Sequence, residues 1–465
     1  MLFRSGEVVR LPFRTLAASD ALLSTMNEQG ELFAVATRSA IQEGASFGST
    51  SFWTRVVDLI QHPTEDMRSA SAAAALRYTF RTPLGPGGKA FQQMIRQWPI
   101  LQLVFPFTTT PGNIFKETAR MTPGLNFAVK EWRADYEAGG MRRDRALAEV
   151  AVGTAIMSQV VLAALNGTVT GGGDPDPMQR ATDRAAGWKP YAFKINGQYI
   201  DGYLRMAPIG ILIGLTADGV EFAKYMTQEE RDQWARMLAF AIAQNVTNQT
   251  MLTGTVNLVN VLQDPARYGE NYFEALAGTV IPGLLGQYAA ERDPLLREIH
   301  GMREAIQARI PFWREGLRPK TDLFGQSIKN PERLWLGSPF STTPISTDKV
   351  RTEAARLGFA SPQKPAKIDV LPGVKLGKMD QVKLTPEQQD IFNTRAGQFA
   401  YEILSPEVQR PEWDRQPAII QRRLFELAFK KGRDVASKEE LMRMITAGEQ
   451  AEVMKKMKQS LQPTP

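Results

Sequence analysis

The spacing of apolar side chains in the N-terminal part of this chain predicts α-helices. From Phe13 to Arg77 apolar residues recur three or four positions apart, which places them on one face of a helix. Gly44 is the expected stop of the first helix, because glycine is favoured just after a helix end. Pro63 then divides two further helices, and the hydroxyl of Thr64 is the expected N-cap of the second.

A similar pattern predicts helices near the C-terminus. Thr385-Pro386 fits the N-cap and first helical positions, and Gln388 completes a capping pattern. Ser405-Pro406 and Ser437 are further candidate starts, so we expect three or four amphipathic helices there. Their basic faces include the stretches FKKGRD and MKKMKQ.

One segment departs from the helical pattern, the stretch YAFKINGQYIDGY at residues 191–203. The Asn-Gly pair at its centre suits the two turn positions that need positive φ, which predicts a type I′ β-hairpin. A two-stranded hairpin is only marginally stable in water, so we expect its apolar face to lie on a helical platform. The anchor residues on that face are Tyr191, Phe193, Ile195 and Ile200, whereas Lys194, Tyr199 and Asp201 lie on the other face.

Four uncharged stretches are the most informative feature of the chain: 150–173, 206–217, 237–263 and 275–290. The apolar part of the first ends at Leu165, which is marginal for a hydrocarbon layer of about 30 Å. A buried central helix is the simpler interpretation, and contact with lipid or a neighbouring subunit is the alternative. The candidate membrane or oligomer contacts are Val150, Ile156, Val160, Leu162, Ile209, Ile211, Ile213, Leu238, Ile242, Leu258, Ile281 and Leu284.

The fold class that follows is mainly α, multi-helix and irregular, with one small β-hairpin and a Pro-rich extended connector. Changes in composition predict four regions. They are an N-terminal helical region at 1–190, a hairpin with apolar helices at 191–308, an extended Pro/Gly-rich connector at 309–380, and a basic helical region at 381–465.

Composition limits the chemistry available to these 465 residues. Cysteine is absent, which excludes disulfides, thiolate metal sites and a cysteine nucleophile. The net charge of +7 is spread over short clusters, so it favours an anionic neighbour only weakly. The N-terminal stretch MLFRSGEVVRLPFR has no apolar core of signal-peptide length, so secretion by that route is not expected.

No motif in the sequence predicts an active site. PLGPGGKA lacks the first glycine and the hydroxyl of a phosphate loop, and GGGDPDP is better explained as a capped turn than as a calcium loop. His62 and His300 have no neighbouring metal-ligand pattern, so each is interpreted as a surface or helix-end histidine. We therefore predict a protein that is not an enzyme, with no catalytic, metal or cofactor residues.

Four segments in a specific order give the chain a resemblance to a known family. They begin with GEVVRLPFRTLAASDALLSTMNEQGELFAVATRSAIQEG and FPFTTTPGNIFKETARMTPG. GWKPYAFKINGQYIDGYLRMAPIGILIGL and RDPLLREIHGMREAIQARIPFWREGLRPKTDLFGQSI follow. Together they resemble a block of very large tailed-phage proteins, known as large polyvalent proteins or internal virion (DNA ejection) proteins. The giant relatives often carry peptidoglycan-cutting or protease modules upstream of this block.

The resemblance implies a bacteriophage protein that is packaged near the portal and ejected with the genome. It would then help to form a DNA-translocation conduit across the host envelope. The implied partners are further copies of the chain, other phage internal or portal proteins, DNA without sequence preference, and the host inner membrane. A static portal-core or tail-lining protein, and an accessory to a peptidoglycan-degrading enzyme, are the alternatives. A cysteine-free chain of mostly local helices would suit passage through a narrow tail, because it has no covalent cross-link to break.

Overall fold

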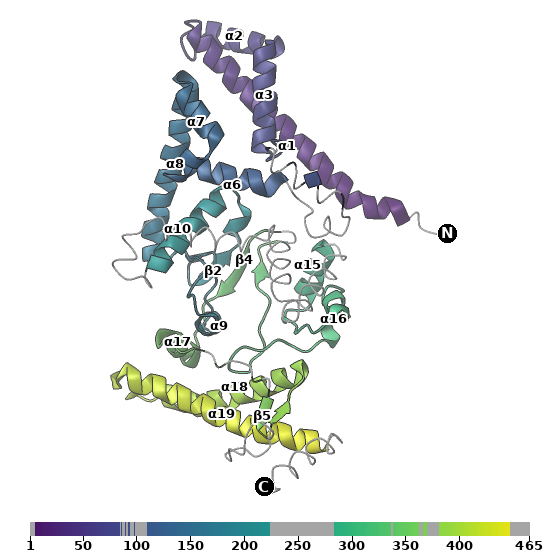
Figure 1. The fold of residues 1–465 in the computed structure, drawn as a ribbon, viewed down its shortest axis with the longest axis vertical. Coiled ribbons are helices and arrows are strands. Elements are labelled where there is room, and N and C mark those ends of the chain that lie inside the picture. The colour runs from purple at the N-terminus through teal and green to yellow at the C-terminus, as the bar shows by residue number, and fades with distance from the viewer. Residues whose placement is uncertain are drawn as a thin grey trace. The chain divides into compact units, whose positions relative to one another are not determined.

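A computed structural model describes residues 5–83, 109–223, 283–335, 338–360, 367–369 and 381–446, and the single residues 85, 89, 92, 93, 97, 362 and 365. It confirms the predicted fold class, because the chain is mainly helical with a small antiparallel sheet (Figure 1). The chain divides into two compact units, Met1–Gly153 and Thr154–Pro465, and each is described by itself. The four regions predicted from composition stay a prediction.

The first unit is built from helices. Their bounds are α1 Ser5–Gln42, α2 Thr50–Gln61, α3 Glu65–Tyr78, α6 Thr109–Met121, the 3-10 turn η1 Leu125–Ala128, α7 Lys130–Glu137, and α8 Gly140–Leu165, which runs on into the second unit. The predicted signals between α1 and α3 are confirmed. Gly44 follows the end of α1 with a φ of 90°, and the Thr64 hydroxyl accepts the Met67 N–H at 3.3 Å.

Buried charges tie the helices of the first unit together. Arg120 on α6 is 3% exposed and pairs with Glu149 on α8 and Asp135 on α7, both at 2.9 Å. Arg77 on α3 also pairs with Glu149, at 2.8 Å. Burial alone would raise the pKa of Asp135, but hydrogen bonds from Arg120 and from Arg142 outweigh it and lower that pKa. The first turns of α8 are therefore fixed by charge in addition to the apolar packing of Ala146 against Trp132.

The second unit combines helices with short strands. Its elements are α9 Pro177–Ala185, β1 Ala192–Ile195, β2 Gln198–Asp201, η2 Tyr203–Arg205, α10 Ile209–Ala223, α15 Gly283–Arg292, α16 Met302–Gln307, η4 Arg314–Gly316, β3 Glu332–Arg333, β4 Ser341–Pro344, α17 Lys349–Arg356, β5 Lys367–Asp369, β6 Gln381–Lys383, α18 Pro386–Val408, η6 Trp413–Arg415 and α19 Ala418–Thr446.

The predicted hairpin is present as β1 and β2, which pair with Phe193 opposite Ile200. It is not isolated, however. β4 pairs antiparallel with β2 and with β3, which gives a four-stranded sheet in the order β1-β2-β4-β3. The extra strand comes from the segment interpreted as a surface connector, so part of that connector supports the hairpin.

The anchor residues of the hairpin are only partly buried. Tyr191 and Phe193 pack in a cluster with Tyr203 and residues of α8 and α10. Ile200 is half-buried, and Ile195 is 48% exposed because it lies next to the turn, at the far end of the hairpin. Tyr199, on the other face, is only 8% exposed. Each face of the hairpin therefore carries a buried aromatic side chain, which the alternation of residue types alone did not indicate.

Two long helices, α18 and α19, form the C-terminal part of the second unit. The predicted capping box of Thr385 and Gln388 is confirmed at the start of α18. The expectation of three or four helices is wrong for the described residues. Pro406 lies in the last turn of α18, and Ser437 lies inside α19. Neither residue starts a new helix. A serine is tolerated inside a helix, and a proline near the end of a helix leaves most of its hydrogen bonds intact.

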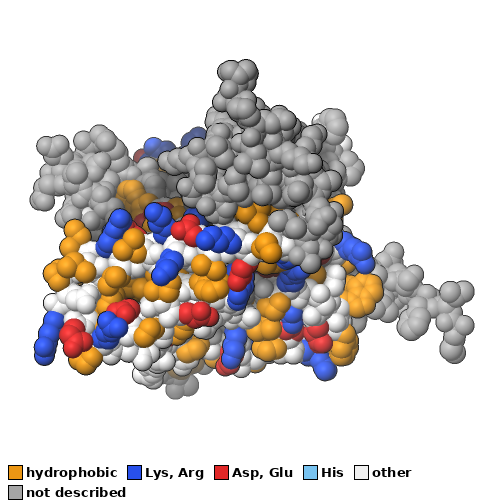
Figure 2. All heavy atoms as spheres, turned by 90° about the horizontal axis from the view of Figure 1, so that it is seen from below, with side chains coloured by type: hydrophobic (Ala, Val, Ile, Leu, Met, Phe, Trp, Pro, Cys, Tyr) orange, Lys and Arg blue, Asp and Glu red, His pale blue; other side chains and the backbone are white. Residues whose placement is uncertain are grey.

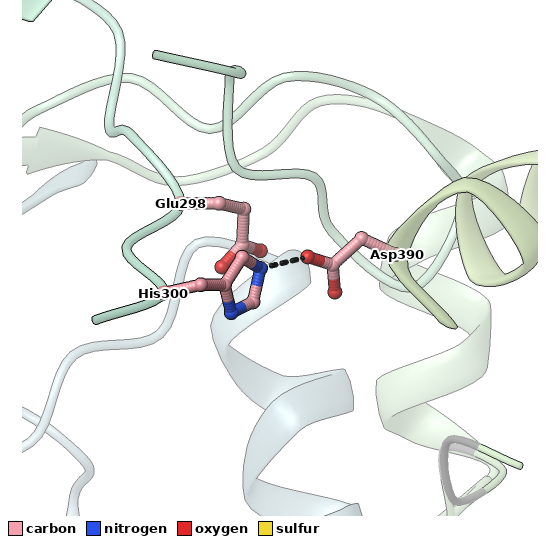
Figure 3. A group of neighbouring side chains, drawn as sticks. All are labelled: Glu298, His300 and Asp390. Atoms are coloured by element: carbon pink, nitrogen blue, oxygen red, sulfur yellow. Dashed lines mark hydrogen bonds and ion pairs between the residues drawn. The ribbon is translucent and has the colours of Figure 1, made fainter. Parts of the chain in front are cut away.

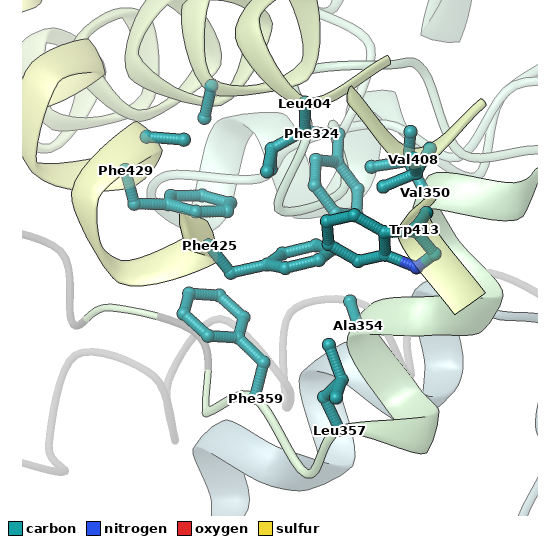
Figure 4. Close-up of a cluster of buried hydrophobic side chains, with 12 residues drawn as sticks. Phe324, Val350, Ala354, Leu357, Phe359, Leu404, Val408, Trp413, Phe425 and Phe429 are labelled. Atoms are coloured by element: carbon teal, nitrogen blue, oxygen red, sulfur yellow. The ribbon is translucent and has the colours of Figure 1, made fainter. Parts of the chain in front are cut away.

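The largest buried cluster of this unit joins α17, α18 and α19 (Figure 4). Phe324 and Phe359 come from the predicted connector. Their rings pack at a tilt against Phe429 on α19, with centroids 5.6 and 5.0 Å from that of Phe429. Trp413 is 1% exposed in the same cluster. The Pro-rich segment therefore supplies core side chains in addition to following the surface.

Asp293, just after α15, organises the loop that follows it. Its carboxylate accepts hydrogen bonds from the guanidinium groups of Arg297 and Arg314, each at 2.8 Å, and it is 4% exposed. Asn330 donates to the Asp293 carbonyl at 3.0 Å. The hydrogen bonds from Arg297, with a smaller contribution from Arg314, lower the pKa of Asp293 to about 2.

The close approach of α18 and α19 depends on glycine. A Cβ at Gly432 on α19 would lie 2.3 Å from the Ala396 carbonyl oxygen on α18. We expect Gly432→Ala to lower the free energy of unfolding by about 1–3 kcal/mol, the usual cost of overpacking. Gly219→Ala on α10 is the control, because its Cβ would meet nothing within 4 Å. Urea unfolding followed by circular dichroism measures both, and equal midpoints for the two variants would contradict the packing argument.

Asp293 makes stability depend on pH. Its folded-state pKa lies below its ordinary value of 3.8, so its contribution is present above about pH 4 and is lost as the pH falls towards 2. The shift from 3.8 to about 2 corresponds to roughly 2 kcal/mol. We expect Asp293→Asn to be less stable at pH 7 and to lose less stability between pH 4 and 2. Glu332→Gln, at an exposed position on β3, should keep the parent profile of unfolding free energy against pH.

Candidate functional site

Helix α8 changes character along its length. Its first turns carry Arg142, Arg143, Asp144 and Arg145, and Glu149 is its last charged residue. From Val150 to Leu165 it is uncharged over roughly 24 Å, at about 1.5 Å per residue. Of the described helices, α8 is the one long and apolar enough to cross a membrane, with a mean hydropathy of 1.7 over eighteen residues.

The described residues cover one side of α8. Gly153 approaches the end of α6 so closely that a Cβ there would lie 1.9 Å from the Met121 carbonyl oxygen. Val160 and Ala164, 7% and 2% exposed, are also covered and pack in the cluster of the second unit. The three positions are seven and four residues apart, so they lie on one side of the helix.

The rest of the uncharged part of α8 faces outward. Four apolar side chains on it are more than a third exposed: Val152 (53%), Val161 (36%), Leu162 (56%) and Leu165 (63%). We call these four residues the α8 surface. Only 17% of the apolar window is buried, whereas the core helix of a soluble protein would be mostly buried. The interpretation of α8 as a buried central helix is therefore wrong.

The other predicted contact residues lie in different surroundings. On α8, Leu162 is exposed, Val150 and Ile156 are half-buried and Val160 is buried. On α10, Ile209 is exposed, but Ile211 and Ile213 are covered by the protein's own side chains. Leu238, Ile242, Leu258, Ile281 and the side chain of Leu284 lie outside the described residues. Val152, Val161 and Leu165 were missed, because a helix that is apolar all round gives no sequence signal for its exposed side.

A carboxylate clamp fixes the chain that follows α8. The backbone N–H groups of Gly171 and Gly173 donate to the Glu221 carboxylate, each at 2.8 Å, and the N–H of Gly172 donates to Asp218 at 2.7 Å. Both acids are on α10, and Asp218 is 2% exposed. The predicted capped turn of GGGDPDP is confirmed just after it, where Asp176 accepts the Met178 N–H at 2.9 Å. The two acids were not predicted, since they lie far from the glycines in the sequence.

Aromatic side chains form a second apolar surface, on the first unit. Phe47 is 72% exposed and lies between α1 and α2, where its ring centroid is 6.2 Å from that of Trp53. Phe33 on α1 stacks on Trp53 at 6.5 Å. Both Phe33 and Trp53 are more than 40% exposed, so large rings gather here without being covered.

The surface of α18 and α19 has a different character. Figure 2, which views the molecule from below Figure 1, shows Lys and Arg side chains interspersed with Asp and Glu and with apolar groups. Several arginines on these helices are paired, including Arg395 with Glu439 and Arg443 with Glu440. The FKKGRD stretch therefore belongs to a face of mixed charge, and MKKMKQ lies outside the described residues.

One cluster of chemically active side chains was missed by the sequence analysis. Glu298, His300 and Asp390 converge from the loop after α15 and from α18 (Figure 3). The His300 Nε2 lies 2.6 Å from an Asp390 carboxylate oxygen, and one ligand atom of each residue lies within 4.8 Å of the others. His300 and Asp390 are 90 residues apart, so no local spacing could have indicated this pairing.

Comparisons of the chain with protein-family models, curated proteins and solved structures found no match. The resemblance to internal virion proteins of tailed phages stays a prediction. The α8 surface, the aromatic surface and the Glu298–His300–Asp390 cluster are therefore the described features from which a function can be argued.

Proposed function

We propose that this chain is a bacteriophage internal virion protein, packaged near the portal and ejected with the genome to help form a conduit across the host envelope. The α8 surface is the observation that carries the proposal. An uncharged helix that the described residues cover on one side leaves apolar area in water, and a lipid layer or another copy of the chain would remove it.

The composition of α8 suits contact between helices as well as contact with lipid. Ala151, Ala155 and Ser158 are exposed on its uncharged part. Small residues let helix backbones approach closely in a membrane, where packing and not the hydrophobic effect drives association. Leu162 follows Ser158 by four positions and Ala155 by seven, so it lies on the same side of α8 as these small residues. Copies of α8 could therefore pack through this side along a common pore wall, with Val152 and Val161 flanking the contact.

The two ends of α8 would remain held in such an assembly. At its start, Glu149 is paired with Arg77 and Arg120. Beyond its end, the carboxylate clamp attaches Gly171–Gly173 to α10. Contact with a membrane thus requires no loss of these interactions for the described part of the chain. The +7 net charge adds a weak attraction for DNA that does not depend on sequence.

The proposal can be tested first in the virion. Quantitative mass spectrometry of full particles and of particles emptied of their genome should find the protein in the former and a large loss in the latter. Its presence at equal amounts in both would favour the static portal-core or tail-lining role instead. Its absence from full particles would contradict both roles.

The role of the α8 surface can be tested with vesicles of phosphatidylethanolamine and phosphatidylglycerol. We expect the purified chain to float with them in a density gradient, and Val152→Asp with Leu162→Asp to abolish flotation. Each added charge costs up to about 3 kcal/mol of insertion free energy. Ile419→Asp with Ile420→Asp on α19 is the matched control, because both residues are also apolar and are 79% and 49% exposed. Equal losses for both variants would contradict a specific contribution of α8.

A further inference from the structure

We propose that Glu298, His300 and Asp390 bind one divalent transition-metal ion, with Zn²⁺ as the preferred ion. The three side chains supply an imidazole nitrogen and two carboxylate groups, and their ligand atoms lie within 4.8 Å of one another. Figure 3 shows the Glu298 carboxylate and the His300 ring turned towards the space next to Asp390. Ligands around one ion at about 2.0–2.2 Å need only small side-chain movements from this arrangement.

The backbone holds two of these ligands in place before any ion arrives. The Glu298 N–H donates to the Arg318 carbonyl at 2.9 Å, in a segment that also pairs through Leu296 and Ile328. The His300 N–H donates to the Glu304 carboxylate at 2.6 Å. In the same loop, the Arg297 guanidinium donates a hydrogen bond to the Asp293 carboxylate. A site whose ligands are already ordered loses less entropy when it binds.

The third ligand comes from a rigid helix. Asp390 lies in the first turns of α18, which the capping box of Thr385 and Gln388 fixes at its start. The hydrogen bond between His300 and Asp390 keeps these two groups together in the absence of metal. An ion would therefore link the loop after α15 to α18, two segments that are far apart in the sequence.

The surroundings favour a cation. The side chains of Glu298 and Asp390 are 14% and 13% exposed, so two carboxylates lie close together in a largely shielded place. The Lys320 ammonium lies 3.9 Å from Glu298, on a side chain that is 46% exposed, so it can move aside. An imidazole ligand suits zinc and other transition ions better than Mg²⁺ or Ca²⁺, which prefer oxygen ligands alone.

The three residues differ from the other histidine–carboxylate pair of the chain. His62 Nδ1 lies 3.3 Å from Asp58, four residues earlier on α2, and the His62 side chain is 78% exposed. No third ligand joins this pair within the described residues. His62 therefore provides an internal control for binding by a single histidine and one carboxylate.

The three ligands of Glu298, His300 and Asp390 are fewer than the four of a closed structural zinc site. A coordination position of the ion therefore stays open to solvent beside His300, which is 36% exposed.

The test uses the full-length, untagged chain, because an affinity tag of histidines would itself bind zinc. After treatment with a chelator, the chain is titrated with Zn²⁺, Mg²⁺ and Ca²⁺ by calorimetry, and with Co²⁺ by visible absorption. We expect one equivalent of Zn²⁺ to bind and Co²⁺ to give a d–d spectrum of a nitrogen- and oxygen-ligated ion. His300→Ala and Asp390→Asn should each weaken Zn²⁺ binding at least about tenfold, the loss that even outer-shell partners cause.

Controls separate loss of a ligand from loss of the fold. His62→Ala should bind Zn²⁺ as the parent does, and Glu298→Gln tests the third ligand with little change in shape. Each variant should keep the parent circular dichroism spectrum without metal. The proposal is overturned if the folded parent shows no saturable binding of Zn²⁺ below about 1 mM. It is also overturned if His62→Ala weakens binding as much as His300→Ala, or if Mg²⁺ competes equally with Zn²⁺.

Discussion

The uncharged part of α8 is retained in place by interactions at its two ends, and this constraint shapes the rest of the structure. At one end the pairs of Glu149 with the buried Arg120 and the half-buried Arg77 fix its direction. Beyond the other end, three glycine N–H groups are held by acids on α10. Between these points the described part of the chain packs against one side of the helix. The helix is thus fixed in position by polar groups and is left with apolar side chains in contact with solvent.

Both units combine buried ion pairs with apolar packing. In the first, Arg120 is shared by α7 and α8, and Phe52 and Trp132 lie in apolar clusters. Breaking one partner of such a network is costly because it leaves a shielded charge behind. The second combines aromatic packing around Phe324 and Phe429, the buried pairs of Asp293 with Arg297 and Arg314, and glycines that let helix backbones touch. In the proposed ejection role, passage through a narrow tail would have to undo both kinds of interaction, and neither includes a covalent link.

Local rules predicted local structure well. The cap at Thr64, the capping box at Thr385 and the Asn-Gly turn of the hairpin are all decided by residues within a few positions of one another. Features decided by distant residues were not predictable in this way. The burial of Tyr199, the clamp on Gly172 by Asp218, and the meeting of His300 with Asp390 each depend on a partner far along the chain. For α8, the uncharged sequence was compatible with a helix buried in the protein and with a helix exposed on its surface, so burial could not be predicted.

β4 is synthesised long after its partner β2, and this order has a consequence for biosynthesis. The Ser341 hydroxyl bonds to Asp201, a residue made 140 positions earlier. Until the ribosome has released β4, the free edge of β2 presents unpaired backbone groups. Several nascent chains on one polysome would expose the edge of β2 at the same time. The β2 strands of two such chains could then pair with each other. A chaperone that covers this edge during the interval would prevent such pairing between chains.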